Sequence, residues 1–362
     1  MKRGQLSALG FQNGQAVRPP TLQAAGQKLA LEAAGILNDV LALPELHPES
    51  KQNRTPVTLA DFLIQIRVML TLAALYPADR FIGEEAFDEN KISEIEGLLK
   101  RRHLFDKYAN LLSEFKQNIF PRYREILFNI NDPDPTPRLW INDPLDGTAG
   151  FINKNGQYAC SLALLQWDGP TRSYSPVYGI IYAPHYRTLY QGEEINGPLV
   201  EAAEGRPLPG LYQTDPASRL EKVGDLDLKK TLEKFIPRGP ITRDSKRFGP
   251  NPLDPFLEKY YPRETFVKHW GSSVVGMLEV ILGNHALYSS AMSLWDFAAA
   301  AYVLSKAGGS PIRADNATPM ERIDLDYLKT ILEKGDRFYP LAATVGGIHA
   351  QNVMECLQRL NG

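Results

Sequence analysis

The sequence has few cysteines. Only Cys160 and Cys356 occur in 362 residues, and neither lies in a CxxC motif or a Cys/His cluster. A disulfide-stabilised scaffold and a zinc site are therefore disfavoured, and a reducing, cytoplasmic location is expected. No apolar run is long enough to span a membrane, and residues 1–3 lead into mixed polar residues rather than the apolar core of a signal peptide. We therefore expect no membrane partner.

An excess of charge of one sign is also lacking. The 40 Lys and Arg residues oppose 42 Asp and Glu residues, which leaves a net charge of −2. Such a chain has no overall positive field to bind a nucleic acid polymer, whereas a few cations could still form a pocket for a small phosphorylated molecule. The composition, 43% apolar and 23% charged, is that of an ordinary globular protein.

Predicted helices and strands alternate along the chain. Apolar residues at helical spacing predict helices over residues 22–43, 59–76, 272–282 and 294–307. Short apolar runs bounded by Pro and Gly predict strands over residues 138–141, 158–165, 177–182 and 187–190. This alternation predicts an α/β or layered α+β sandwich, in which helix layers and sheet layers follow one another.

The strongest chemical signal is the segment WINDPLDGT at residues 140–148. A short apolar strand leads to two carboxylates, Asp143 and Asp146, and Gly147 follows where a helix or tight turn could begin. A few carboxylate oxygens suit Mg²⁺, which completes its coordination with water and substrate phosphate. Backbone N–H groups at the following turn can bind phosphate oxygens. The alternative is a surface turn, because Asp-Pro and Asp-Gly are common turn pairs.

Three other segments place acidic residues next to ordered elements. Glu84 and Glu85 follow a short apolar strand, Asp296 lies in the first turn of an Ala-rich helix, and Asp61 follows Thr58 at the start of the second predicted helix. Each has an ordinary structural explanation: solvated loop charges, a charge at a helix N-terminus, and a capping box. Capping and catalysis do not exclude each other at Asp61. The conjunction of all four segments favours a functional site.

In this order, the four segments resemble the signature motifs of the inositol monophosphatase superfamily of Mg²⁺-dependent, lithium-sensitive phosphatases. The resemblance extends from about residue 22 to residue 309 and is carried mainly by DPLDGT at 143–148 and WDFAA at 295–299. It implies an inositol monophosphatase-like fold, phosphoric monoester hydrolase activity and a cofactor of two or three Mg²⁺ ions.

The resemblance also implies a set of metal ligands. One metal ion would be held by Glu84, Asp143 and the backbone carbonyl of Leu145, and a second by Asp143, Asp146 and Asp296. Paired metal ions neutralise phosphate charge and acidify water, so no nucleophilic Ser or Cys is required.

Further residues receive roles in catalysis and phosphate binding from the same resemblance. Asp61 and Thr148 would orient or deprotonate the attacking water. Glu84 would also contribute, by activating water or through a third metal ion. The backbone N–H groups of Gly147 and Thr148 would bind the phosphate that is removed.

Within the superfamily, the flanking motifs are most similar to those of the 3′(2′),5′-bisphosphate nucleotidases. TPVTLAD at 55–61 and CSLAL at 160–164 carry this similarity, which implies substrate contacts at Ser272 and Ser273. The usual cations of these enzymes are absent, since Val275 stands where a Lys is common and Ser290 lies where an Arg is common.

Other cations could replace the missing contacts to a second phosphate. The candidates are Arg243, Lys246 and Lys268. Their ordinary explanation is that they are solvated surface charges, the more common situation of Lys and Arg. The substrate therefore stays open between a nucleotide bisphosphate, an inositol phosphate and a sugar phosphate.

Two subdomains are expected, separated within the Gly- and Pro-containing residues 197–210. Residues 1–200 would form an N-terminal α+β subdomain that carries most metal ligands, with a helical insertion at about 86–138. Residues 201–362 would form a C-terminal α/β subdomain that carries Asp296 and the substrate wall. A homodimer would suit this class of protein. A non-catalytic relative that binds a phosphorylated metabolite is the alternative to an enzyme, and the retained metal carboxylates disfavour it.

Overall fold

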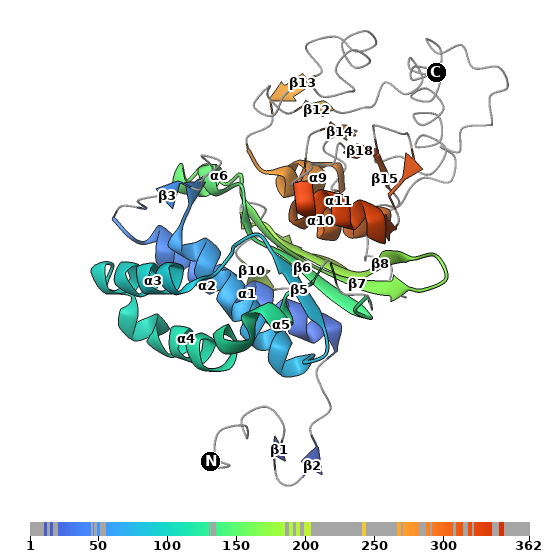
Figure 1. The fold of residues 1–362 in the computed structure, drawn as a ribbon. Coiled ribbons are helices and arrows are strands. Elements are labelled where there is room, and N and C mark those ends of the chain that lie inside the picture. The colour runs from blue at the N-terminus through green and yellow to red at the C-terminus, as the bar shows by residue number, and fades with distance from the viewer. Residues whose placement is uncertain are drawn as a thin grey trace, which may run out of the picture.

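The structure, a computed structural model, consists of alternating layers of helices and sheets (Figure 1). The described residues are 11–12, 15–16, 21–44, 46, 49–50, 56–129, 131, 135–184, 188–190, 193–195, 199–203, 241–243, 266–268, 271–281, 287–289, 292–306, 309–313, 318–320, 322–334 and 340–343. In this part of the chain, no helix combines the length and the apolar character that a bilayer span requires.

A mixed sheet lies at the centre of the molecule, with the strand order β11-β8-β7-β6-β5 and β17 also paired to β8. Its strands are β5 (Arg80–Gly83), β6 (Arg138–Asp146), β7 (Ala159–Asp168), β8 (Ser173–Tyr182), β11 (Leu199–Ala203) and β17 (Ile323–Asp324). β5 and β6 are parallel, and β6, β7, β8 and β11 are successive antiparallel neighbours. The predicted strands at 138–141, 158–165 and 177–182 are confirmed.

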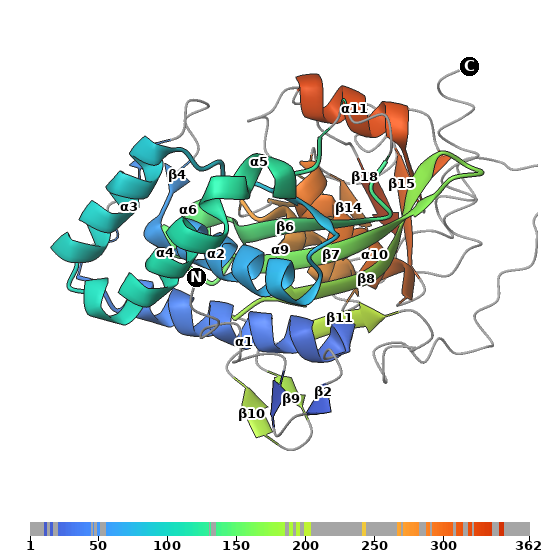
Figure 2. The ribbon, with the colours of Figure 1, turned by 60° about the horizontal axis from the view of Figure 1, so that its bottom comes forward.

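The two N-terminal helices cover one face of this sheet, as Figure 2 shows. They are α1 (Leu22–Leu41) and α2 (Leu59–Leu75). Thr21 caps α1 by accepting a hydrogen bond from the Ala24 N–H, and Thr58 caps α2. Both helices begin at the residue that the sequence predicts.

Two further helices cover the other face and separate the central sheet from a second sheet (Figure 1). They are α9 (Ser273–Ile281) and α10 (Leu294–Lys306). The second sheet has the order β13-β12-β14-β18-β15-β16. Its strands are β12 (Ile241–Arg243), β13 (Phe266–Lys268), β14 (Leu287–Ser289), β15 (Ser310–Arg313), β16 (Thr318–Pro319) and β18 (Pro340–Ala343). The predicted layered sandwich is confirmed.

Alternation of side chains along β6 divides the apolar core into two parts. Trp140 packs on the side of α1 and α2, whereas Leu139 and Ile141 pack on the side of α9 and α10. The same period of two continues along β7, where Leu164 and Leu165 lie in different parts. Both faces of β6 and β7 are therefore buried, which explains the apolar runs within these strands.

Helices occupy the segment for which an insertion at about 86–138 is expected. They are α3 (Glu89–Arg101), α4 (Phe105–Asn118), η1 (Phe120–Arg122) and α5 (Tyr123–Ile126). Phe115 of α4 is fully buried, and its ring lies 5.0 Å from that of Phe87. The helices are therefore fixed by an aromatic core and do not merely lie on the surface.

The remaining described elements are short. They are the hairpins of β1 (Phe11–Gln12) with β2 (Gln15–Ala16), β3 (Glu49–Ser50) with β4 (Pro56–Val57), and β9 (Thr188–Tyr190) with β10 (Glu193–Ile195), together with the helices α6 (Thr148–Ile152) and α11 (Leu325–Lys334). β9 matches the strand predicted at 187–190. β11 pairs with β8 in the central sheet and extends across the predicted boundary between residues 200 and 201.

Candidate metal and phosphate site

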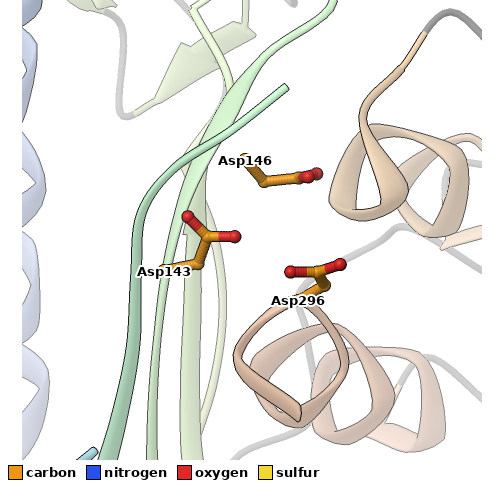
Figure 3. A group of neighbouring side chains, drawn as sticks. All are labelled: Asp143, Asp146 and Asp296. Carbon is orange, nitrogen blue, oxygen red and sulfur yellow. The ribbon is translucent and has the colours of Figure 1, made fainter. Parts of the chain in front are cut away.

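Three carboxylates from two layers of the fold meet beside the central sheet. Asp143 and Asp146 come from the end of β6, and Asp296 comes from the first turn of α10 (Figure 3). One ligand oxygen from each lies within 4.8 Å of the other two. The three residues expose only 1%, 8% and 9% of their surface. The three residues that the sequence assigns to one metal ion thus lie close together in the structure.

A bulge in β6 allows both of its acidic residues to reach the site. The pairing of β6 with β7 is regular up to Asp143 and resumes at Asp146 after a shift in register. Pro144 lies in this shift, where it needs no N–H to donate to the ladder. Residues 143–146 are therefore part of a buried strand, and the alternative of a surface turn is wrong.

The charges around this group are unfavourable without a cation. Burial raises the pKa of Asp143 well above its usual value, and the charges of Glu84, Asp296 and Asp146 raise it further. Burial, followed by the charge of Asp296, likewise raises the pKa of Asp146. Closely spaced buried carboxylates are stable as anions only with a compensating charge. An all-oxygen donor set of this kind fits a hard divalent cation such as Mg²⁺.

Asp146 is held by the beginning of α9. Ser272 Oγ donates a hydrogen bond of 2.5 Å to Asp146 Oδ2, and the Val274 N–H donates another of 2.6 Å. Ser272 also accepts from the Val275 N–H at 3.1 Å, as an N-cap does. Ser272, predicted to contact the substrate, thus donates to a candidate metal ligand. Ser273, the other predicted substrate contact, is the first residue of α9 and is half-buried.

Asp61 reaches the site through Thr148. Its Oδ2 accepts hydrogen bonds from the Thr58 N–H at 2.8 Å and from Thr58 Oγ1 at 2.7 Å, which completes the predicted capping box. Its Oδ1 lies 3.3 Å from Thr148 Oγ1. The Thr148 hydroxyl also lies 3.1 Å from the Leu145 carbonyl oxygen, the predicted backbone ligand. Asp61 therefore caps α2 and also contacts the candidate water-orienting hydroxyl.

Gly147 makes a turn that no other residue fits. Its φ of 82° is left-handed, and an added Cβ would lie 2.5 Å from the Gln157 carbonyl oxygen and 2.7 Å from the Ser272 Cβ. This residue caps α6 and presents the backbone N–H groups that follow β6. The close approach to Ser272 also joins the acidic strand to the start of α9.

Glu84 lies just outside the group of three carboxylates. It follows β5, and its N–H donates to the Asn142 carbonyl oxygen at 3.3 Å. It is half-buried, and its charge acts on both Asp143 and Asp146. The sequence did not identify Gln65, whose side chain holds the backbone of the adjacent Glu85. Its only sequence signal is its position one helical turn after Asp61.

The predicted cations for a second phosphate are only partly described. Arg243 and Lys268 are the last residues of β12 and β13, and they are paired in register. Arg243 also pairs with Ser289 at the end of β14, so three parallel strands end at one edge. Nothing is described of the side chains of Arg243 and Lys268, and Lys246 lies outside the described residues.

The model of the inositol monophosphatase family matches residues 20–352 of the chain. This chain belongs to the inositol monophosphatase family. The family match covers β6, α9 and α10, the elements that carry the acidic group and hold it in place. It also confirms the resemblance that the motifs indicate.

Curated members of the family match shorter segments. A 3′(2′),5′-bisphosphate nucleotidase of Emericella nidulans is 33% identical over 132 residues, which cover 34% of this chain and 36% of the relative. Inositol monophosphatase 1 of Saccharomyces cerevisiae is 29% identical over 206 residues, which cover 56% of this chain and 62% of the relative. The matched parts thus span between about a third and three fifths of these relatives.

Solved structures support the fold over nearly the whole chain. The crystal structure of the extragenic suppressor protein suhB from Bartonella henselae has a TM-score of 0.55 and covers 94% of this chain and 98% of that chain. Its sequence identity is 16%, so the likeness shows the fold alone.

Proposed function

We propose that this protein is a Mg²⁺-dependent phosphomonoesterase that hydrolyses a small phosphorylated metabolite. The observation that carries the proposal is the buried group of Asp143, Asp146 and Asp296, with ligand oxygens within 4.8 Å of one another. A stable protein rarely buries three such charges unless an ion compensates them. Membership of the inositol monophosphatase family supports the same function.

The candidate ligands would hold two of the two or three Mg²⁺ ions that the family resemblance implies. Asp143, Asp146 and Asp296 would hold one, and Glu84, Asp143 and the Leu145 carbonyl would hold another. Mg²⁺ in such a site supplies positive charge that neutralises phosphate oxygens and makes water more acidic. Ser272 and the Val274 N–H support this role because they fix the Asp146 carboxylate with two short hydrogen bonds.

Thr148 and Asp61 would prepare the attacking water. When the Thr148 hydroxyl donates to Asp61 Oδ1, its own lone pairs are available to accept a hydrogen bond from water. As Thr148 Oγ1 takes a proton from the water, its own hydroxyl proton would pass to Asp61 Oδ1, so Asp61 would be the final proton acceptor. Backbone N–H groups of Gly147 and Thr148, at the turn after β6, would bind phosphate oxygens.

A 3′(2′),5′-nucleoside bisphosphate is the substrate that we propose. The curated relatives named as bisphosphate nucleotidases support it, as does the shared edge at which the strands of Arg243 and Lys268 end. An inositol phosphate or a sugar phosphate is the alternative, and the relative named inositol monophosphatase 1 supports it. The absence of the usual second-phosphate cations, with Val275 in one position, also favours the alternative.

A screen of phosphate release tests both the proposed phosphatase activity and the proposed substrate. Purified full-length protein with Mg²⁺ should hydrolyse a nucleoside bisphosphate at least about tenfold faster, in kcat/KM, than inositol 1-phosphate or a sugar monophosphate. The opposite preference would be consistent with the proposed phosphatase activity but would contradict the proposal of a nucleotide bisphosphate as substrate. Binding of these compounds with no phosphate release would instead favour a non-catalytic relative.

Variants of the candidate cations refine the substrate test. Arg243→Ala, Lys246→Ala and Lys268→Ala should each raise KM for the bisphosphate about tenfold more than KM for a monophosphate analogue. Loss of a contact to a remote phosphate weakens binding of ground state and transition state alike, so kcat should change little. Equal changes for both substrates would contradict a second-phosphate pocket at these residues.

A further inference from the structure

Gln65 forms a two-point contact with the chain directly after Glu84. Its Nε2 donates to the Glu85 carbonyl oxygen at 2.5 Å, and its Oε1 accepts from the Glu85 N–H at 2.9 Å. The side chain thus satisfies both backbone groups of Glu85, as a neighbouring strand would. Gln65 exposes 0% of its surface, so both bonds are shielded from water.

These bonds hold the loop where β5 ends. The Glu84 N–H is bonded to the Asn142 carbonyl, which continues the pairing of β5 with β6. The next residue is then held by Gln65 from the side of α2. The backbone of Glu84 is therefore held on both of its sides, by β6 and by α2, and the range of positions open to its carboxylate is reduced.

Gly83 makes this contact possible. An added Cβ would lie 2.5 Å from both the Cδ and the Oε1 of Gln65. Its φ is not in the left-handed region, so backbone conformation does not require glycine here. Glycine is required here because the Gln65 amide occupies the space beside it. A methyl group at position 83 would displace that amide from Glu85.

Gln65 also lies one turn after Asp61 on α2. The same helix therefore carries the acid that contacts Thr148 and the amide that holds the Glu84 loop. A neutral amide suits the position, because a carboxylate would offer no donor to the Glu85 carbonyl and would add negative charge near Glu84 and Asp143.

We propose that Gln65 is a positioning residue that fixes Glu84 relative to Asp61 and Asp143, so that Glu84 can serve the metal site. The inference rests on the proposed phosphatase function. A purely structural role would require only that the buried amide be satisfied, and its loss would then lower stability without affecting metal binding. The two roles therefore differ in a measurable way.

The test compares Gln65→Met and Gly83→Ala with the control Ile64→Val in the full chain. Gln65→Met keeps the length of the side chain and removes both bonds, whereas Ile64→Val shortens a buried neighbour on α2 and leaves the amide in place. Isothermal titration with Mg²⁺ should show affinity weakened about tenfold or more in both test variants and unchanged in the control. kcat should fall about ten- to hundredfold, with the substrate KM changed less than about twofold.

A double variant gives a second line of evidence. If Gly83→Ala acts by displacing the amide, its effects and those of Gln65→Met should not add. Gln65→Met with wild-type Mg²⁺ affinity and kcat would overturn the inference, even if its melting temperature falls. Should that variant fail to fold, Gly83→Ala decides on the same two measurements. A wild-type protein that releases no phosphate would refute the proposed function, whereas weakened Mg²⁺ binding by the variants would still support the positioning role.

Discussion

Asp61 and Asp143 are equally buried carboxylates with different surroundings. Asp61 accepts hydrogen bonds from the Thr58 N–H and from the hydroxyls of Thr58 and Thr148. Asp143 accepts one from the Leu145 N–H, and the charged groups that act on it are acidic. Neutral donors of the protein thus surround Asp61, whereas acidic neighbours surround Asp143, so a cation would stabilise the Asp143 group in its charged form. Burial alone does not identify a metal ligand; the set of donors and charges around it does.

Removal of metal should have the largest effect on activity, and it should act through the acidic group that contains Asp143. Excess chelator should abolish phosphate release, Mg²⁺ should restore it, and Ca²⁺ should inhibit because it tolerates looser coordination. Mg²⁺ at about 100 times its Kd should also add about 2.7 kcal/mol to the free energy of unfolding. Phosphate assays and thermal melts measure both effects. Full activity in excess chelator would refute a metal-dependent reaction.

Asp143→Asn should lower kcat by about two to three orders of magnitude, because the lost charge acts on metal and transition state. The metal-free variant should melt at a higher temperature than metal-free wild type, since one of several repelling charges is gone. Asp39→Asn is the matched control, because Asp39 lies on α1 and bonds to Tyr108 and Lys107 away from the site. A fall in kcat in the control as large as in Asp143→Asn would contradict the ligand assignment.

Asp61→Asn should separate the capping role from the catalytic role. Asp61 is the N3 residue of the capping box, and the amide oxygen of an Asn there can still accept from the Thr58 N–H, so the free energy of unfolding should fall by about 1 kcal/mol or less. kcat should nevertheless fall about a hundredfold or more, because the proton acceptor beside Thr148 is lost. Chemical denaturation and steady-state kinetics on one preparation measure both values. A variant with normal turnover and reduced stability would leave Asp61 only its structural role.

Local patterns in the sequence predicted much of the fold and of the acidic group. The helical spacing and the caps of α1 and α2 are properties of a few consecutive residues, and the same is true of the Thr58–Asp61 capping box. The β6 strand was predicted to end at Ile141, but it continues to Asp146. Proline argues against a central strand unless the strand bulges, and a bulge depends on the partner strand β7.

Contacts between distant segments could not be predicted in the same way. Ser272 and Asp146 are 126 positions apart, and Gln65 and Glu85 are 20 apart. Which donor meets which acidic residue depends on how α9 and α2 pack against the central sheet. Serine at a helix start and glutamine within a helix are common, so neither residue type marks such a contact by itself.

Thr58→Ala should have the smallest effect and should sharpen the comparison most. It removes the hydroxyl bond to Asp61 and the cap on the Ala60 N–H, and leaves the bonds from its backbone N–H and from Thr148. We expect a loss of about 1–2 kcal/mol in the free energy of unfolding, with kcat reduced less than about tenfold.

Thr21→Ala is the matched control, because Thr21 caps α1 at an exposed position away from the acidic group. Thr21→Ala should lower the free energy of unfolding by about 1 kcal/mol and leave kcat unchanged. If Thr58→Ala instead reduces kcat as strongly as Asp61→Asn, the remaining two donors do not hold Asp61 in place. Asp61 would then depend on the Thr58 hydroxyl for its position, and several neutral donors would no longer distinguish it from Asp143.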